Sequence, residues 1–369
     1  MVAAPLGHIK QLDGIRAIAV LLVIVSHWLP GGIAGRFGFG AIGVDIFFVL
    51  SGFLITRILI VERLKFSTAP STNSRLKSIK NFMVRRSLRI FPIYYLLLIL
   101  LVFCAKQFPN PVAQDWGWYF FYLQNILFYI KQEWPGGKLS HLWSLAVEEQ
   151  FYLFWPWLIL FVSQKWILKL MVFSFLIGIA LVYYLPTLNR GSMAEVLTPT
   201  CMQAFASGGI LAYFHIERGS EFHQLKYHFL IPGLISFAYL IMGLNGFLPL
   251  LVDLRTIISI FMVGLIATIL INPNFFISSK ILGNPALVFL GRISYGIYLF
   301  HNFIPVLMNA FLHKLEKDNS GFANLTYKKH LFDQGVLFYG ICFCLLFFIT
   351  IFSFYFFEQP VNKLKRYFT

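Results

Sequence analysis

The sequence predicts an all-α fold, a polytopic membrane helical bundle with about ten transmembrane helices, and two observations lead to this prediction. Of the 369 residues, 58% are hydrophobic and only 12% are charged, whereas a soluble domain carries about 25% charged residues. Apolar runs also recur along the whole chain, and about 20 apolar residues suffice to span a bilayer. This composition excludes a disordered chain and an ordinary water-soluble enzyme. We expect residues 1–369 to form a single integral-membrane domain.

The apolar runs place ten expected spans along the chain. Residues 116–130 are also apolar, but this stretch is short and rich in Tyr and Trp, which favours an interfacial or re-entrant helix. The first run resembles a signal peptide, yet it lacks a convincing cleavage site, so we keep it as a helix of the mature protein. The expected spans are 15–29, 40–60, 90–105, 143–162, 166–185, 196–214, 229–245, 254–272, 286–312 and 335–357.

The net charge of +15 arises from 30 Lys and Arg against 15 Asp and Glu. The basic residues lie between apolar runs, so membrane orientation explains them better than nucleic-acid binding, and we expect no nucleic-acid partner. The connection between the second and third spans is strongly basic, which marks it as cytoplasmic and, with ten spans, places both termini in the cytoplasm. Its basic residues are Arg57, Arg63, Lys65, Arg75, Lys77, Lys80, Arg85, Arg86 and Arg89.

The cysteine and histidine patterns predict neither a disulfide framework nor a metal site. Cys104, Cys201, Cys342 and Cys344 lie in or beside apolar runs and form no CxxC pair. The H-E-x-x-H zinc motif and a Gly-rich phosphate loop are also absent from the sequence. We therefore expect no bound metal.

Ionisable side chains inside lipid are costly, which makes them candidate functional residues. Arg16 and His27 share one face of the first span, about 16 Å of helix rise apart. On the expected topology His27, Asp45 and Glu148 all fall in the outer third of the membrane, and a His held by a carboxylate is a common general base for a hydroxyl. Structural interpretations stay open, because Arg16 can snorkel and Asp45 can interact with a helix dipole.

Polar residues also recur at helical spacing within the fourth and ninth expected spans. Each stripe shares a helix face, so it either lines a cavity or forms satisfied hydrogen bonds in a packed core. Glu149 lies about 100° away from the first stripe. The stripes consist of Ser144, Glu148 and Tyr152 in the fourth span and Ser294, Tyr298 and His301 in the ninth.

Arg85, Arg86 and Arg89 cluster where the third span begins. Guanidinium groups bind phosphate oxygens through paired hydrogen bonds, so this cluster is a candidate phosphate site. Positive-inside anchoring with contacts to lipid headgroups is the alternative interpretation.

Five segments together resemble acyltransferase family 3, the multi-span membrane O-acyltransferases. They are LDGIRAIAVLLVIVSHW, GVDIFFVLSGFLI, RRSLRIFPIYY, SLAVEEQFY and GRISYGIYLFH. The resemblance implies a ten-helix domain that moves an acyl group, commonly acetyl, from acyl-CoA to a hydroxyl of a surface glycan, a lipid-linked sugar or a glycosylated small molecule. It maps the family's Arg-and-His pair onto Arg16 and His27, its glutamate onto Glu148, and its arginine motif onto Arg86 and Arg89.

The resemblance also leads to a hypothesis for the mechanism. The three arginines would hold the CoA phosphates at the cytoplasmic mouth, the thioester would pass Arg16, and His27, oriented by Glu148 or Asp45, would take the proton of the acceptor hydroxyl. Direct transfer and an acyl-enzyme both stay open. The catalytic candidates are His27, Asp45 and Glu148, the donor-binding candidates are Arg16, Arg85, Arg86 and Arg89, and the substrate-binding candidates are Ser144, Tyr152, Tyr298 and His301.

The expected acceptor is a glycan such as lipopolysaccharide O-antigen or another exopolysaccharide, and the expected location is a bacterial inner membrane. Some relatives carry a fused extracellular hydrolase-like domain, which we do not expect here because the sequence ends shortly after the last span. Two other classes are open. A secondary transporter predicts paired broken helices, which the sequence does not show. In a non-catalytic membrane partner, the polar groups would only hold helices together.

Overall fold

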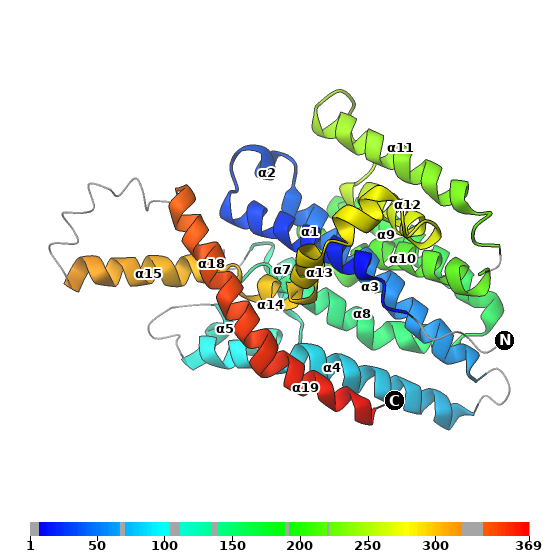
Figure 1. The fold of residues 1–369 in the computed structure, drawn as a ribbon, viewed down its shortest axis with the longest axis horizontal. Helices are drawn as coiled ribbons and strands as arrows, with labels where there is room; N and C mark the ends of the chain where they lie inside the picture. Colours follow the sequence, from blue (N-terminus) through cyan, green and yellow to red (C-terminus); the bar gives the residue numbers. More distant parts are fainter. Residues whose placement is uncertain are drawn as a thin grey trace.

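The computed structural model describes residues 7–66, 71–103, 111–134, 139–188, 192–219, 221–318 and 335–368. These residues form helices and connecting turns without strands (Figure 1), which confirms the all-α fold. Within them, seven helices are long and apolar enough to cross a membrane, or eight if the bent pair α14–α15 counts as one span. The expected number of ten is therefore approximate.

The long helices coincide with the expected spans, and short helical segments connect them. The long helices are α1 (Lys10–Trp28), α3 (Phe39–Leu64), α4 (Thr72–Phe103), α8 (Leu142–Phe161), α9 (Gln164–Thr187), α10 (Thr198–Glu217), α11 (Lys226–Leu244), α12 (Leu254–Ile271), α15 (Phe303–Asp318) and α18 (Val336–Ser353). The short segments are α2 (Gly32–Arg36), α5 (Pro111–Gln114), α6 (Trp116–Phe120), α7 (Gln124–Lys131), η2 (Ser192–Val196), η3 (Ile277–Leu282), α13 (Pro285–Arg292), α14 (Ser294–Phe300), η5 (Phe354–Glu358), α19 (Gln359–Lys363) and η6 (Leu364–Tyr367).

The helices depart from the expected spans in three places. Helix α4 begins at Thr72, well before residue 90, because its basic first half continues the helix beyond the apolar part that hydropathy detects. The ninth span is broken into α13, α14 and α15, with a bend of 47° between the last two. Helices α8 and α10 are not among the candidate spans, because their polar residues lower the mean hydropathy of the helix.

The apolar stretch 116–130 is not a span. It forms α6 and α7, which are separated by a turn where Tyr122 adopts a left-handed backbone with φ of 55°. The thiols of Cys201, Cys342 and Cys344 are free. Cys104 and residues 319–334, most of the expected outer loop after the ninth span, lie outside the described residues.

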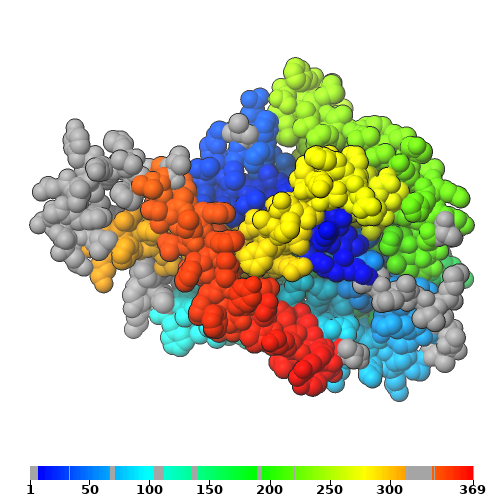
Figure 2. Space-filling view, viewed as in Figure 1, coloured from blue at the N-terminus to red at the C-terminus, as the bar shows by residue number. Residues whose placement is uncertain are grey.

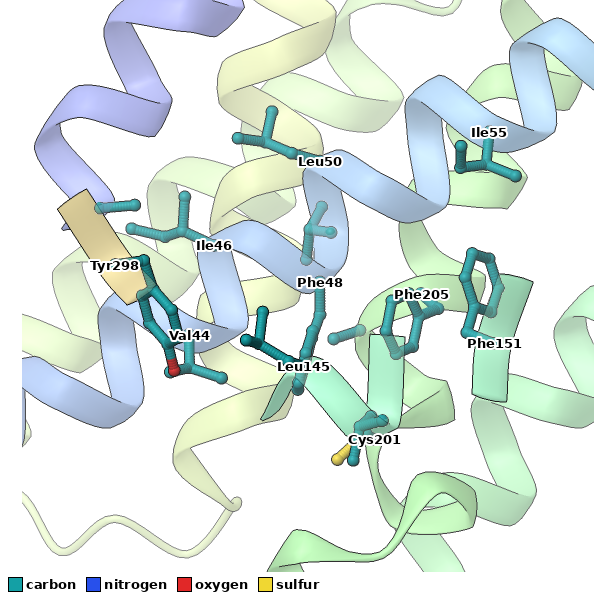
Figure 3. Close-up of a cluster of buried hydrophobic side chains, with 14 of the residues drawn as sticks. Val44, Ile46, Phe48, Leu50, Ile55, Leu145, Phe151, Cys201, Phe205 and Tyr298 are labelled. Carbon is teal, nitrogen blue, oxygen red and sulfur yellow. The ribbon is translucent and has the colours of Figure 1, made fainter. Parts of the chain in front are cut away.

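Helix α3 lies at the centre of the bundle and contacts α1, α8, α10 and α12. It crosses α10 at backbone distance, since a Cβ on Gly52 would lie 2.0 Å from the Phe205 carbonyl oxygen and a Cβ on Gly208 would lie 2.1 Å from the Val49 oxygen. Around this crossing the rings of Phe48, Phe151 and Phe205 form a stacked core (Figure 3). Gly52 and Gly208 thus permit the close packing of α3 on α10.

The two ends of the bundle differ in what they carry. Residues 7 and 8 and the C-terminal segment α19–η6 line one cavity, so we call this the termini end. The opposite end, where α1 ends and α3 and α8 begin, is called the far end. Figure 2 shows the start of α1 in dark blue beside the yellow segment that contains α12 and α13, and α1 packs directly on η3 and α13. This arrangement brings Arg16 of α1 into the bundle interior.

Candidate active site

Three cavities follow one another from the termini end to the far end, and neighbouring cavities share lining residues. The first, which we call the vestibule, has a volume of about 470 Å³. The second, the neck, has about 70 Å³, and the third, the far cavity, has about 400 Å³. The vestibule and the neck share Arg16, Ser51, Arg86, Arg89 and Tyr152, and the neck and the far cavity share Val44 and Tyr298. The three cavities lie in a row, and the middle one has room for an extended chain rather than a sugar ring.

The vestibule carries an excess of positive charge. Asp13 is shared among His8, whose Nε2 lies 2.7 Å from its carboxylate, Arg16, whose Nη1 lies 3.3 Å away, and Arg292, whose Nε lies 4.0 Å away. Four other cationic groups on the vestibule wall form no ion pair within the described part of the chain, which makes this cavity suitable for a polyanion. They are Arg57, Arg86, Arg89 and Lys365.

Helix α4 presents two of its three clustered arginines to this cavity. Arg86 and Arg89 are one turn apart and both line the vestibule and the neck. The Arg86 guanidinium lies 5.5 Å from the ring centres of Phe82 and Tyr152, which hold it in place. Arg85 is rotated by about 100° relative to Arg86, lines none of the three cavities, and donates a hydrogen bond to the Phe368 carbonyl. The structure therefore does not place Arg85 with the other two.

The polar stripe of α8 lines the neck as its spacing predicts, since Ser144, Glu148 and Tyr152 all face this cavity. The hydroxyls of Ser51 and Tyr152 both donate to the same carboxylate oxygen of Glu148. Tyr152 sits at the boundary with the vestibule, where Arg16 also faces both cavities. The carboxylate thus belongs to the middle of the row of cavities.

This position corrects the expected pairing of Glu148 with His27. The structure contains no hydrogen bond between them, and Glu148 does not line the far cavity. The reason is depth, because α8 begins at Leu142 and Glu148 lies about 9 Å farther along the helix axis. Position within a span had suggested the outer third of the membrane for both residues.

A hydroxyl pair marks the junction between the neck and the far cavity. The Tyr298 hydroxyl lies 2.5 Å from Ser144 Oγ, and the His141 carbonyl oxygen lies 2.9 Å from Tyr298 and 3.1 Å from Ser144. One hydroxyl therefore donates to this carbonyl and the other donates to its neighbouring hydroxyl. Tyr298 lines both cavities, whereas Ser144 lines only the neck. The substrate-binding candidates Ser144 and Tyr298 therefore lie where the neck adjoins the far cavity.

His27 lies on the wall of the far cavity with a defined tautomer. Its Nδ1 is 2.9 Å from the Val23 carbonyl oxygen. A carbonyl only accepts, so we assign the proton to Nδ1, and Nε2 keeps its lone pair. The ring packs edge-on against His301 and His141, with ring centres 5.0 and 6.3 Å away. This nitrogen is the general-base candidate.

The group that orients His27 is a second histidine rather than a carboxylate. His301 is buried, and its Nδ1 lies 2.7 Å from the Tyr298 carbonyl oxygen, so its Nε2 is an acceptor by the same reasoning. That Nε2 lies 3.4 Å from Nδ1 of His27. The Nδ1–H group of His27 therefore donates to two acceptors, which are Nε2 of His301 and the Val23 carbonyl oxygen. His301 is a positioning residue in this arrangement and does not line the far cavity.

Asp45 lines the far cavity but is bound to another partner. Its carboxylate accepts a hydrogen bond from Arg255 Nε at 2.6 Å, and the same guanidinium donates to the Glu195 carbonyl at 3.2 Å. No hydrogen bond joins Asp45 to His27 in the described structure. The expected orienting role of Asp45 is therefore absent from this geometry.

Sequence reasoning missed several lining residues. His141 precedes Ser144 by one helical turn, so its place on the same face was a usable signal. Arg255 lies at the start of α12, two residues after Asp253. In the sequence it resembles an ordinary helix-end residue, because its partner Asp45 is 210 positions away. Trp134 and Trp143, which line the far cavity, carried no signal within so aromatic a chain.

Comparison with known proteins agrees with this architecture. A family model described as an acyltransferase domain matches residues 9–358, nearly the whole chain. The chain belongs to acyltransferase family 3. The peptidoglycan O-acetyltransferase OatA of Listeria monocytogenes is 33% identical over 325 residues, which are 80% of this chain and 49% of that protein.

A second relative is the O-acetyltransferase OatA of Staphylococcus aureus, which is 29% identical over 341 residues, 82% of this chain and 52% of that protein. The chain thus spans about half the length of the curated relatives it matches. No solved structure matches the chain significantly. The long apolar helices and the family together make this family member an integral membrane protein.

Proposed function

We propose that this protein is a membrane O-acetyltransferase that takes the acetyl group of acetyl-CoA at the termini end and transfers it to a hydroxyl of a cell-surface glycan at the far end. The observation that carries the proposal is the row of three adjoining cavities, which has cations without ion pairs at one end and the Nε2 lone pair of His27 at the other. Family membership supports the same reaction class.

The vestibule suits the phosphates of CoA. Arg86 and Arg89 form no ion pair within 4.0 Å in the described part of the chain and lie at the entrance to the neck. Their planar guanidinium groups match phosphate oxygens. The pantetheine arm is an extended chain, which is what the neck has room for. Arg16 and His27 are about 16 Å apart along α1, so the arm would carry the thioester from the vestibule to the far cavity.

In the far cavity, His27 would act as the general base. Its Nε2 takes the proton of the acceptor hydroxyl as that oxygen bonds to the thioester carbonyl carbon. The C–S bond then breaks, and the sulfur takes the proton from the imidazolium to leave as the thiol of CoA. His301 stays an acceptor for Nδ1–H of His27 throughout, so the ring keeps its orientation when it is charged.

The far cavity has the character of a glycan site. Trp134 and Trp143 present large amphipathic rings, and hydroxyls of Ser26 and Ser140 line the same wall. Lipopolysaccharide O-antigen and other exopolysaccharides are acceptors of this kind, and the name of the Listeria relative adds peptidoglycan. The termini end would face the cytoplasm of a bacterial inner membrane, because acetyl-CoA is cytoplasmic and the basic 65–89 segment lies at that end.

The test uses the full chain in proteoliposomes with acetyl-CoA labelled in its acetyl group. We expect release of free CoA and label in a glycan, with His27→Ala slower by about 10²–10⁴-fold. His223→Ala, which removes an exposed histidine on a turn, is the matched control and should keep full activity. Full activity of a folded His27→Ala protein would exclude the assigned role.

The acceptor is identified by mass spectrometry of three cell-surface fractions with and without the gene. A difference of one acetyl group in lipopolysaccharide, exopolysaccharide or peptidoglycan would name the glycan. No difference in any of them would contradict the proposed acceptor class. Solute flux through the proteoliposomes without acetyl transfer would instead show a transporter.

A further inference from the structure

The vestibule contains two polar atoms that are buried and have no hydrogen-bond partner. They are Nε of Arg57 on α3 and Oδ1 of Asn362 on α19. One is a donor and the other is an acceptor, and they come from opposite ends of the sequence. A buried polar atom without a partner is destabilising, so both atoms point to a ligand that supplies an acceptor and a donor.

Both residues lie toward the mouth of the vestibule. Arg57 is six residues beyond Ser51 on α3, about 9 Å closer to the termini end than the boundary with the neck. Asn362 belongs to the C-terminal segment, and Lys365 of η6 adds an unpaired ammonium group to the same wall. Arg85 fixes this segment against α4 through its hydrogen bond to the Phe368 carbonyl.

The structure of CoA limits which of its parts can lie at the mouth of the vestibule. If Arg86 and Arg89 hold the phosphates next to the neck, the remaining part of CoA at the mouth is its adenosine end with the 3′-phosphate. Adenine carries an exocyclic amino donor beside ring-nitrogen acceptors, an edge that Asn side chains read. Pantetheine carries neither a phosphate nor a heteroaromatic edge, and lipid headgroups carry a phosphate but no heteroaromatic edge.

We propose that Arg57 and Asn362 recognise the adenosine end of acyl-CoA, with Lys365 on its 3′-phosphate. Asn362 Oδ1 accepts from the adenine amino group, and Arg57 Nε donates to a ring nitrogen or a phosphate oxygen. The inference rests on the proposed function, because it concerns the donor of that reaction. It assigns to the C-terminal segment a role in choosing CoA over a shorter carrier.

The experiment compares two donors, acetyl-CoA and acetyl-4′-phosphopantetheine, which keeps the arm and one phosphate but lacks the adenosine end. The variants are Asn362→Ala and Arg57→Lys, and Lys363→Ala is the control because it alters the exposed neighbour that does not line the vestibule. We expect the wild-type protein to prefer acetyl-CoA. Each variant should raise KM for acetyl-CoA roughly tenfold, with kcat unchanged.

Activity with acetyl-4′-phosphopantetheine distinguishes the loss of an adenosine contact from a general loss of folded protein. The KM of Asn362→Ala for acetyl-4′-phosphopantetheine should equal that of wild type, because this donor has no adenine for Asn362 to contact. An equal loss with both donors would overturn the inference, as would an unchanged KM for acetyl-CoA or a wild type that uses both donors equally well. A wild type that transfers acetyl from neither donor would overturn the proposed function itself, which is a distinguishable result.

Discussion

Replacing Arg255 by Gln should destabilise the protein far more than replacing Arg255 and Asp45 together. Asp45 is 2% exposed, and its carboxylate is held by Arg255 Nε at 2.6 Å. Removing one partner of a buried ion pair leaves the other charge unpaired, which costs about 3–5 kcal/mol, whereas removing both charges is nearly neutral. The double variant Asp45→Asn/Arg255→Gln should therefore regain most of the stability that Arg255→Gln loses.

The assay is equilibrium unfolding of the purified protein in mixed micelles, followed by tryptophan fluorescence, together with acetyl transfer for every variant. Arg218→Gln is the matched control, because its ion pair with Glu221 is more than half exposed on both sides. An exposed pair of this kind contributes about 0–1 kcal/mol. The control should therefore unfold close to wild type.

Two results would refute the reasoning. A double variant that is as unstable as Arg255→Gln would show that the pair is not the source of the stability. A folded Asp45→Asn protein with the same loss of activity as His27→Ala would show that Asp45 acts on the reaction, as its position in the sequence suggested. The structure predicts instead that Asp45 shapes the wall of the far cavity.

Three further predictions concern packing, orientation and donor binding. Gly52→Val should lower the free energy of unfolding by at least 1–3 kcal/mol, because its Cβ would overlap the α10 backbone, while Gly340→Ala, which has open space, should be neutral in the same unfolding assay. His301→Ala should lower kcat by on the order of tenfold to a hundredfold, less than His27→Ala, and an unchanged kcat would exclude the positioning role. Arg86→Lys should raise KM for acetyl-CoA, because an ammonium group lacks the planar guanidinium that pairs with phosphate and packs on the rings of Phe82 and Tyr152. Isothermal titration with CoA measures the affinity, and a Kd equal to that of wild type would contradict the prediction.

Local patterns were sufficient for the parts of the site that lie on one helix. The stripe of Ser144, Glu148 and Tyr152 lines the neck because residues four apart share a face whatever surrounds the helix. The same periodicity places Arg86 and Arg89 near one face and turns Arg85 about 100° away from Arg86, although all three arginines were expected to bind the donor. Helical periodicity therefore predicts which residues share a wall.

Pairings between helices were beyond such reasoning. His27 and Asp45 each contact a partner from a distant part of the chain, which is His301 for His27 and Arg255 for Asp45. Depth within the membrane, the only criterion available for pairing, does not fix rotation about the helix axis. The wrong pairings of His27 with Glu148 and Asp45 came from this gap.

The amino-acid sequence alone determined that this protein dissolves in a bilayer as a helical bundle, because hydropathy and charge along the chain act locally and need no tertiary contact. It also carried the family's motifs in order. Only the tertiary structure decided that the motifs line a row of adjoining cavities, that a histidine contacts His27, and that the C-terminal segment lines the vestibule together with α3. The physical reason is that a contact between helices depends on how tightly they cross, as at Gly52 and Gly208, and on which faces that crossing turns inward.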